Sequence, residues 1–262
     1  MDLGLRDSVV LITGAAGSLG RGLVLGFARQ GARLFITDRD GDGLERVREE
    51  IQGSGVACAA KGADVTRSNE VHALVSEAAR IYEGRVDVLV NAAGIAWQGR
   101  IEEMDERSWD EIFAVNCRGA FLFVREVVPF MKERRRGKIV NFSSKSGKTG
   151  SALLGAYSAA KAAIIGFTQS LAFELAEYGI NVNCVCPGLV RDSGMCDLLF
   201  EDYARNLSLS MEEVEKRFAA KVPLNRLGRI DDVVDTVLFL ASSRSDYLTG
   251  QAVNVSGGRE VH

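Results

Sequence analysis

The first forty residues contain one unit that constrains the fold more than any other part of the chain. A short apolar, β-branched run at residues 8–13 leads into the glycine-rich turn Thr13-Gly14-Ala15-Ala16-Gly17-Ser18-Leu19-Gly20, and an amphipathic stretch follows through Gln30. A second apolar run at residues 33–37 ends at Asp38. Strand, glycine turn, helix and strand in this order are typical of a βαβ unit. The unit predicts an open α/β sheet that binds its ligand at the carboxyl ends of the strands.

The glycine turn also predicts what binds there. Glycines let the backbone approach a pyrophosphate, whose charge is stabilised by free N–H groups and by the positive end of the helix dipole. Asp38 follows Gly20 by eighteen residues. An acid at this position accepts hydrogen bonds from the adenosine ribose hydroxyls and repels a 2′-phosphate, so NAD is favoured over NADP. In the alternative interpretation, Asp38 only opens the turn Asp38-Arg39-Asp40-Gly41.

The rest of the chain repeats the alternation of apolar runs and helical stretches. Further strands are predicted near residues 55–60, 86–90, 138–143, 180–185 and 251–255. With 262 residues, 47% of them hydrophobic, the chain is long enough for one large core, and it contains no linker or internal repeat. We therefore predict a single α/β domain over residues 1–262, with a Rossmann-type doubly wound parallel sheet of about seven strands.

A tyrosine and a lysine at helical spacing indicate the chemistry. Residues 153–178 are predicted to form a helix, so Tyr157 and Lys161 share one face of it. A free tyrosine has a pKa near ~10, and a neighbouring cation favours the phenolate. Ser144 follows the strand predicted at 138–143, and its hydroxyl is placed to hold the substrate oxygen that Tyr157 protonates. The three side chains predict acid/base chemistry on an alcohol or a carbonyl. By itself, the Tyr157–Lys161 spacing also fits an ordinary surface pair.

Together these motifs resemble the short-chain dehydrogenase/reductase family over nearly the whole chain. Residues 13–20 resemble the family's T-G-x-x-x-G-x-G turn, residues 91–94 its N-N-A-G segment, and Pro187-Gly188 the dipeptide after its sixth strand. The chain departs from the pattern at two positions. Ser18 replaces the middle glycine of the turn, with Gly17 one place early, and Ala92 replaces the second asparagine of N-N-A-G.

The resemblance implies a catalytic set and a cofactor site. Tyr157 would be the general acid/base, Lys161 would lower its pKa and bind the nicotinamide ribose, and Ser144 would orient the substrate oxygen. Asn116 would kink its helix and hold a water that relays protons to Lys161. The implied NAD-binding residues are Gly14, Gly17, Ser18, Leu19, Gly20, Asp38, Asp64, Val65, Asn91, Gly94, Tyr157, Lys161, Pro187, Gly188 and Val190.

The substrate is predicted from the segment at about 189–222, which we expect to form a lid of two short helices. Lys145 and Arg191 lie near the predicted pocket and favour a small polyol, a sugar alcohol or its phosphate, although both cations equally fit solvent or cofactor phosphate. The segment 195–229 is also similar to that of bacterial sugar-alcohol dehydrogenases. Alternative functions are a 3-oxoacyl thioester or hydroxysteroid reductase and, from another class, a dinucleotide-sensing scaffold.

Composition limits the remaining partners. The net charge is −3, and the basic run at 132–138 closes a predicted helix, so nucleic-acid binding is not expected. Two histidines and five cysteines without a C-x-x-C pair predict no metal site. No apolar run approaches the ~18 residues of a membrane span, and no signal sequence is recognisable, so we expect a cytoplasmic protein. We expect a homotetramer, from the resemblance and from surplus apolar residues on the predicted helices 108–136 and 153–178, namely Phe121, Phe123, Val124, Ala163 and Phe173.

Overall fold

A computed structural model describes residues 3–262, apart from the side chains at positions 195, 198, 202, 206 and 207. Its centre is one parallel sheet of seven strands in the order β3-β2-β1-β4-β5-β6-β7. The strand order reverses beside β1, which creates the crevice where such sheets bind ligands. The predicted fold class and all seven predicted strands are confirmed: β1 (Val9–Thr13), β2 (Arg33–Thr37), β3 (Cys58–Ala60), β4 (Val88–Asn91), β5 (Gly137–Phe142), β6 (Ile180–Pro187) and β7 (Ala252–Val255).

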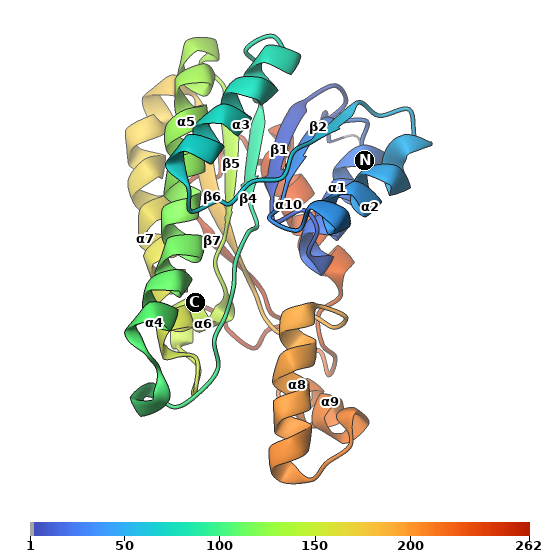
Figure 1. Cartoon of the computed structure of the whole chain (residues 1–262), viewed down its shortest axis with the longest axis vertical. Coiled ribbons are helices and arrows are strands. Elements are labelled where there is room, and N and C mark those ends of the chain that lie inside the picture. Colours follow the sequence, from blue (N-terminus) through green and yellow to red (C-terminus); the bar gives the residue numbers. More distant parts are fainter. Residues whose placement is uncertain (1–2) are drawn as a thin grey trace.

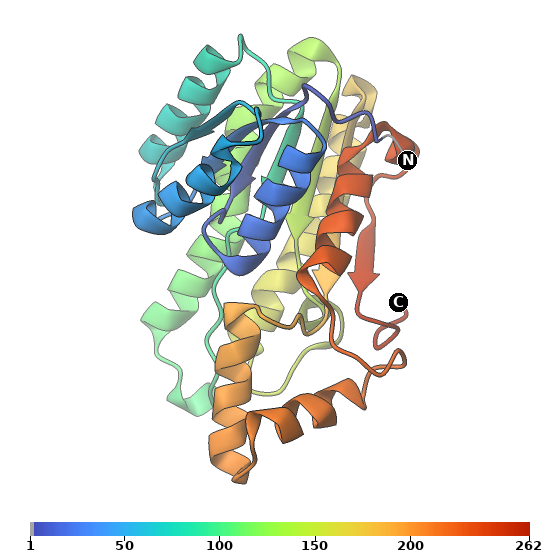
Figure 2. The ribbon, with the colours of Figure 1, turned by 90° about the vertical axis from the view of Figure 1, so that its right-hand side faces the viewer.

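Helices cover both faces of the sheet, as Figures 1 and 2 show. One face packs on α1 (Ser18–Arg29), α2 (Gly41–Gln52) and α10 (Ile230–Ala241), and the other on α3 (Ser68–Ile81), α5 (Gly119–Arg134) and α7 (Gly155–Leu175). Alternate strand residues enter alternate cores: Val10 and Ile12 of β1 join the first core, and Val9 and Leu11 join the second. Burial on both faces explains why the strands read as continuous apolar runs.

The helix predicted at 108–136 is interrupted. α4 (Glu106–Phe113) passes into a π-helical turn at Ala114–Arg118 before α5 begins. Asn116 lies in this turn, where its side-chain nitrogen donates to the backbone oxygen of Ile112 at 2.9 Å. A side chain bonded to the backbone in this way competes with the regular α-helical ladder, and π-turns often occur at functional sites. The predicted kink at Asn116 therefore takes the form of a π-turn.

The segment predicted as a lid consists of two helices at the carboxyl end of the sheet. α8 (Gly194–Leu207) and α9 (Met211–Ala219) project away from the main body in both views (Figures 1 and 2). The base of the segment is closed by a parallel bridge between Val190 and Gly228. Ser210 and Glu213 form a reciprocal capping box that begins α9. The remaining connections contain one short helix, α6 (Lys145–Thr149), and three 3₁₀ turns, at Ile101–Glu103, Ala176–Tyr178 and Ser243–Ser245.

Across residues 3–262, none of the helices has the length and apolar character needed to cross a membrane. In the same described part of the chain, no three His, Cys, Asp or Glu side chains gather into a group suited to a metal ion.

Candidate active site

The glycine turn brings the first strand, the first helix and the fourth strand together. Gly14 has φ +70°, and a Cβ there would lie 2.7 Å from the backbone of Ala93. A Cβ on Gly20 would lie 1.9 Å from the oxygen of Gly14. Only glycine fits either position, so the turn closes tightly under the N-terminus of α1. Within the described structure, no side chain caps that N-terminus, which leaves its N–H groups available to an anion.

Thr13, the first residue of the glycine motif, has a role that was not predicted from the sequence. Its hydroxyl oxygen accepts from the N–H groups of Ala92 and Ala93, at 3.1 and 3.2 Å. The contact joins the glycine turn to the segment after β4. Ala92 therefore keeps a backbone role at the position where the family pattern has a second asparagine. Asn91 lies buried beside this contact and donates through its side chain to the side-chain oxygen of Asn141 at 2.9 Å.

Asp38 ends β2 with its carboxylate fixed by the backbone. One oxygen accepts from the N–H of Ala16 and the other from the N–H of Asp40, both at 3.0 Å. The carboxylate thus opens the turn that follows it and also bonds the glycine turn. This geometry is compatible both with a role in ribose binding and with a role in the turn alone. A shallow hollow of about 320 Å³ lies alongside, between the ends of β2 and β3. Its lining includes the predicted Asp64, and also Arg39 and Gly62, which were not predicted.

Tyr157, Lys161 and Ser144 are brought together by α7 and the end of β5. All three are at least nine-tenths buried. The ammonium of Lys161 lies 5.7 Å from the centre of the Tyr157 ring and donates to the backbone oxygen of Phe142 at 2.8 Å. The Ser144 hydroxyl is near enough to the Tyr157 hydroxyl to lower its pKa. This buried cluster contradicts the surface-pair interpretation.

The Asn116 side chain faces the same cluster from the π-turn. Its nitrogen donates to the backbone oxygen of Ile95 at 2.8 Å. A Cβ on Gly94 would lie 2.8 Å from the Asn116 side-chain oxygen and 3.3 Å from the Lys161 nitrogen, so both atoms point at one glycine. The Asn116 oxygen is buried without a hydrogen-bond partner among the described residues. An unpaired buried oxygen opposite an ammonium is suited to a bridging water.

Ser143 also proves to be part of this cluster. Its hydroxyl donates to the backbone oxygen of Lys161 at 2.7 Å, while the Lys161 ammonium returns a bond to the neighbouring Phe142. The two bonds fix Lys161 to β5 at both its backbone and its side chain.

The sequence predicts a lowered pKa for Tyr157. Among the protein's own side chains this prediction is wrong. Burial raises the pKa of Tyr157 to about 12, and the hydrogen bond from Ser144 lowers it by less. Burial also lowers the pKa of Lys161 to about 8. The physical reason is shared, because both groups lose hydration that favours their charged forms. Tyr157 is thus set as a proton donor at neutral pH.

The remaining predicted positions lie at the carboxyl edge of the sheet. The N–H of Gly188 donates to the oxygen of Val255 at 3.0 Å, which fixes the turn after Pro187. Val65 is buried beside the hollow that Asp64 lines.

Two predicted substrate-side cations behave differently. Lys145 is half-buried and donates to the hydroxyl of Ser151 at 2.9 Å, on the loop that follows Ser144. Arg191 has 61% of its side chain exposed and pairs with Glu215 of α9 at 3.6 Å. Lys145 therefore lies beside Ser144, and Arg191 joins the chain after β6 to α9.

A Rossmann sheet with a tight glycine turn and, beside it, a buried Tyr–Lys–Ser–Asn cluster defines a dinucleotide-dependent oxidoreductase. The sequence model of the short chain dehydrogenases matches residues 8–204. The chain belongs to this family, whose members are oxidoreductases acting on CH–OH groups.

Individual relatives extend the likeness over the whole chain. The 2-(S)-hydroxypropyl-CoM dehydrogenase 3 of Xanthobacter autotrophicus is 36% identical over 254 residues, which cover 97% of each chain. The crystal structure of an NAD⁺-bound xylitol dehydrogenase superposes with a TM-score of 0.92 at 28% identity, covering 97% of this chain and 99% of the other. An actinorhodin polyketide ketoreductase with NADPH gives a TM-score of 0.93 at 35% identity, with 98% of both chains covered.

Proposed function

We propose that this enzyme transfers a hydride between NAD and a secondary alcohol or its ketone, with a small polyol, a sugar alcohol or its phosphate as substrate. The observation that carries the proposal is the buried convergence of Tyr157, Ser144, Lys161 and Asn116 from separate elements. A dinucleotide-sensing scaffold needs the glycine turn alone and has no use for this cluster. The complete cluster therefore favours catalysis.

The residues along the carboxyl edge of the sheet fit a bound dinucleotide. The uncapped start of α1 and the glycine turn, residues 14–20, suit the pyrophosphate, Asp38 suits the adenosine ribose, and the hollow lined by Asp64 suits the adenine. Asn91, Gly94, Lys161 and the turn from Pro187 to Val190 would hold the nicotinamide half. When bound, the nicotinamide accepts or donates the hydride.

The protein's own part is movement of one proton. Tyr157 donates its hydroxyl proton to a substrate carbonyl, or takes the proton of a substrate alcohol, while the hydroxyl of Ser144 holds the same oxygen. The Lys161 ammonium stabilises negative charge that develops on the phenol oxygen. A water between Lys161 and the unpaired Asn116 oxygen would replace the proton from solvent.

Asp38 supports NAD as the preferred cofactor. Both carboxylate oxygens are fixed by backbone donors and present their remaining lone pairs outward. A 2′-phosphate would meet this negative charge, and the neighbouring turn carries Ala15 and Ala16 where a basic residue would be needed to offset it. The same feature argues against an NADPH-dependent 3-oxoacyl thioester reductase.

Asp38→Ala should narrow the preference for NAD over NADP by about tenfold or more, because a ribose contact and a repulsive charge are lost together. The ratio of kcat/KM values for the two cofactors measures the change. Asp42→Ala, at an exposed acid on α2, is the matched control and should leave the ratio unchanged. A wild-type enzyme that prefers NADP would contradict this assignment.

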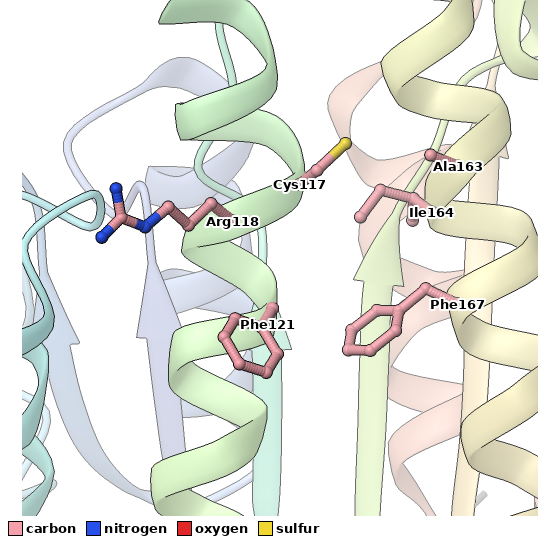
Figure 3. A pocket seen from close by; sticks show the side chains of 6 residues that line it. All are labelled: Cys117, Arg118, Phe121, Ala163, Ile164 and Phe167. Atoms are coloured by element: carbon pink, nitrogen blue, oxygen red, sulfur yellow. The ribbon is translucent and has the colours of Figure 1, made fainter. Parts of the chain in front are cut away.

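We also propose a homotetramer, with one interface on the face formed by α5 and α7. A hollow of about 390 Å³ lies there. Its lining side chains, shown in Figure 3, are Cys117, Arg118, Phe121, Ala163, Ile164 and Phe167. On this face, Phe121 is 44% exposed, and Phe173 of α7 is 87% exposed. Two copies related by a twofold axis would place such projecting rings against each other's hollows. Phe123 and Val124 do not contribute, because both are buried in the core.

Light scattering at micromolar concentration should give a mass several times the 28.3 kDa of one chain. Phe121→Asp should lower the mass, because a charge would be buried at the interface. Ile81→Asp on α3 is a control at another exposed apolar residue and should not change the mass. A 28.3 kDa wild-type species would reject the oligomer, and indifference to Phe121→Asp would reject this interface.

A further inference from the structure

The last seven residues of the chain fold back against the carboxyl end of the sheet. The side chain of Asn254, on β7, donates to the backbone oxygen of Glu260 at 3.1 Å, and the hydroxyl of Ser256 accepts from the N–H of Glu260 at 3.2 Å. The N–H of Leu224, at the end of the lid segment, donates to the oxygen of Gly257 at 3.2 Å. The tail is thus fixed between β7 and the lid.

This fold buries a charged pair. The Glu260 side chain is only 5% exposed and that of Arg259 26%, with Arg259 Nε lying 3.6 Å from Glu260 Oε1. Arg259 Nη1 and Glu260 Oε2 are both buried without a hydrogen-bond partner among the described residues. An unpaired donor beside an unpaired acceptor is costly to bury and suits one oxygen that both accepts and donates.

The pair lies next to the loop that follows the catalytic serine. Lys148, on the helix α6 that begins with Lys145, donates to the backbone oxygen of Ala252 at 2.7 Å, so α6 packs against β7, the strand that leads into the tail. Burial lowers the pKa of Lys145, Arg259 lowers it further, and Glu260 opposes both. Lys145 also bonds Ser151, whose hydroxyl lies 2.8 Å from that of Ser146. Ser146 in turn donates its N–H to the Ser144 hydroxyl at 3.1 Å. A hydrogen-bonded chain therefore links Ser144 through Ser146 and Ser151 to Lys145, whose pKa responds to the charges of the tail.

We infer that Arg259, Glu260 and Lys145 form a subsite for the end of the substrate distal to the reacting carbon. The subsite takes a hydroxyl, whose oxygen accepts from Arg259 and Lys145 and whose O–H donates to Glu260; a phosphate-ester oxygen would accept from the two cations and face the Glu260 carboxylate unpaired. This inference rests on the proposed function and adds to it two specificity-determining residues from the C-terminus. The hydrogen bond from Leu224 to Gly257 joins the tail to the chain that follows α9.

The test compares Arg259→Gln and Glu260→Gln with wild type on three probes: a hexitol, its terminal phosphate ester, and 2-butanol, which lacks a distal polar group. Each variant should raise KM for the polar probe that wild type prefers by about tenfold, the usual contribution of one charge-assisted hydrogen bond. The KM for NAD and the kinetics with 2-butanol should stay unchanged. Arg259→Lys should restore part of the loss, because it keeps a cationic donor.

Arg217→Gln and Glu212→Gln, at exposed positions on α9, are the matched controls and should leave all constants unchanged. If Arg259→Gln raises KM more for the phosphate ester than for the hexitol, the distal end of the substrate is anionic. If Glu260→Gln raises KM more for the hexitol than for the phosphate ester, the distal end is a hydroxyl. Equal effects on all probes and on NAD would show a structural role and overturn the inference. Unchanged KM values would show that a water alone fills the gap. Activity with 2-butanol but neither polar probe would overturn the subsite and leave the oxidoreductase standing.

Discussion

Tyr157→Phe should abolish turnover while NAD still binds. The change removes only the oxygen that carries the transferred proton, and the ring stays packed in its buried site. A positioned acid/base group contributes typically 10²–10⁴-fold, so the variant should keep about 1% of the wild-type kcat or less. Steady-state kinetics measure the loss, and calorimetric titration with NAD measures the binding that remains.

Tyr247→Phe is the matched control. Tyr247 is fully exposed and precedes β7, at the amino end of that strand, so it lies away from the carboxyl edge of the sheet. Its kinetics should equal those of wild type. A Tyr157→Phe enzyme with a tenth of the wild-type rate would remove Tyr157 from its role. Loss of NAD binding together with activity would instead indicate a damaged site.

The second large effect is expected at Gly20. An alanine methyl there would lie 1.9 Å from the Gly14 oxygen and 2.8 Å from the Ala15 Cα, and both neighbours are backbone that cannot rotate away. Gly20→Ala should lower the free energy of unfolding by about 2–3 kcal/mol, as overpacking in a tight site does. The midpoint of thermal unfolding should fall by roughly 5–10 °C. Added NAD should stabilise the variant less than wild type, because the turn must open.

Gly41→Ala is the control for the same chemical change. No atom of the described structure outside its own neighbours lies within 4 Å of the added methyl, and Gly41 is the first residue of α2. Alanine favours a helix over glycine, so stability should be unchanged or slightly higher. Equal unfolding midpoints for the two variants would contradict the proposed geometry of the cofactor turn.

The sheet could be predicted from the sequence because its order depends on local signals. A strand buried on both faces is a continuous apolar run, and the tight turn after β1 requires glycine, so both features are visible in the residues themselves. The break of the helix at Ala114–Arg118 is harder to predict. There the Asn116 side chain bonds Ile112 within the helix and also Ile95, a residue from a separate loop that only the tertiary fold brings near.

The electrostatics of the site could not be predicted for the same reason. Helical spacing places Lys161 near Tyr157, but the pKa of Tyr157 depends on how much water the fold removes, and burial raises it. Likewise, Ser143 bonds Lys161 and Thr13 bonds Ala92 across distant parts of the chain. No periodicity in the sequence reports these contacts. Arg191 shows the converse, since its charge suggested a substrate contact and the fold pairs it with Glu215.

The central claim is NAD-linked oxidation of a polyol-type secondary alcohol at the Tyr157 site. The most direct measurement follows the ultraviolet absorbance of reduced nicotinamide when purified enzyme is mixed with NAD or NADP and, in turn, a hexitol, its phosphate, a 3-hydroxyacyl thioester and a hydroxysteroid. We predict the highest kcat/KM with NAD and one of the two polyol probes, and no turnover by Tyr157→Phe. Preference for NADP with the thioester or the steroid would contradict the account, as would polyol turnover that survives Tyr157→Phe.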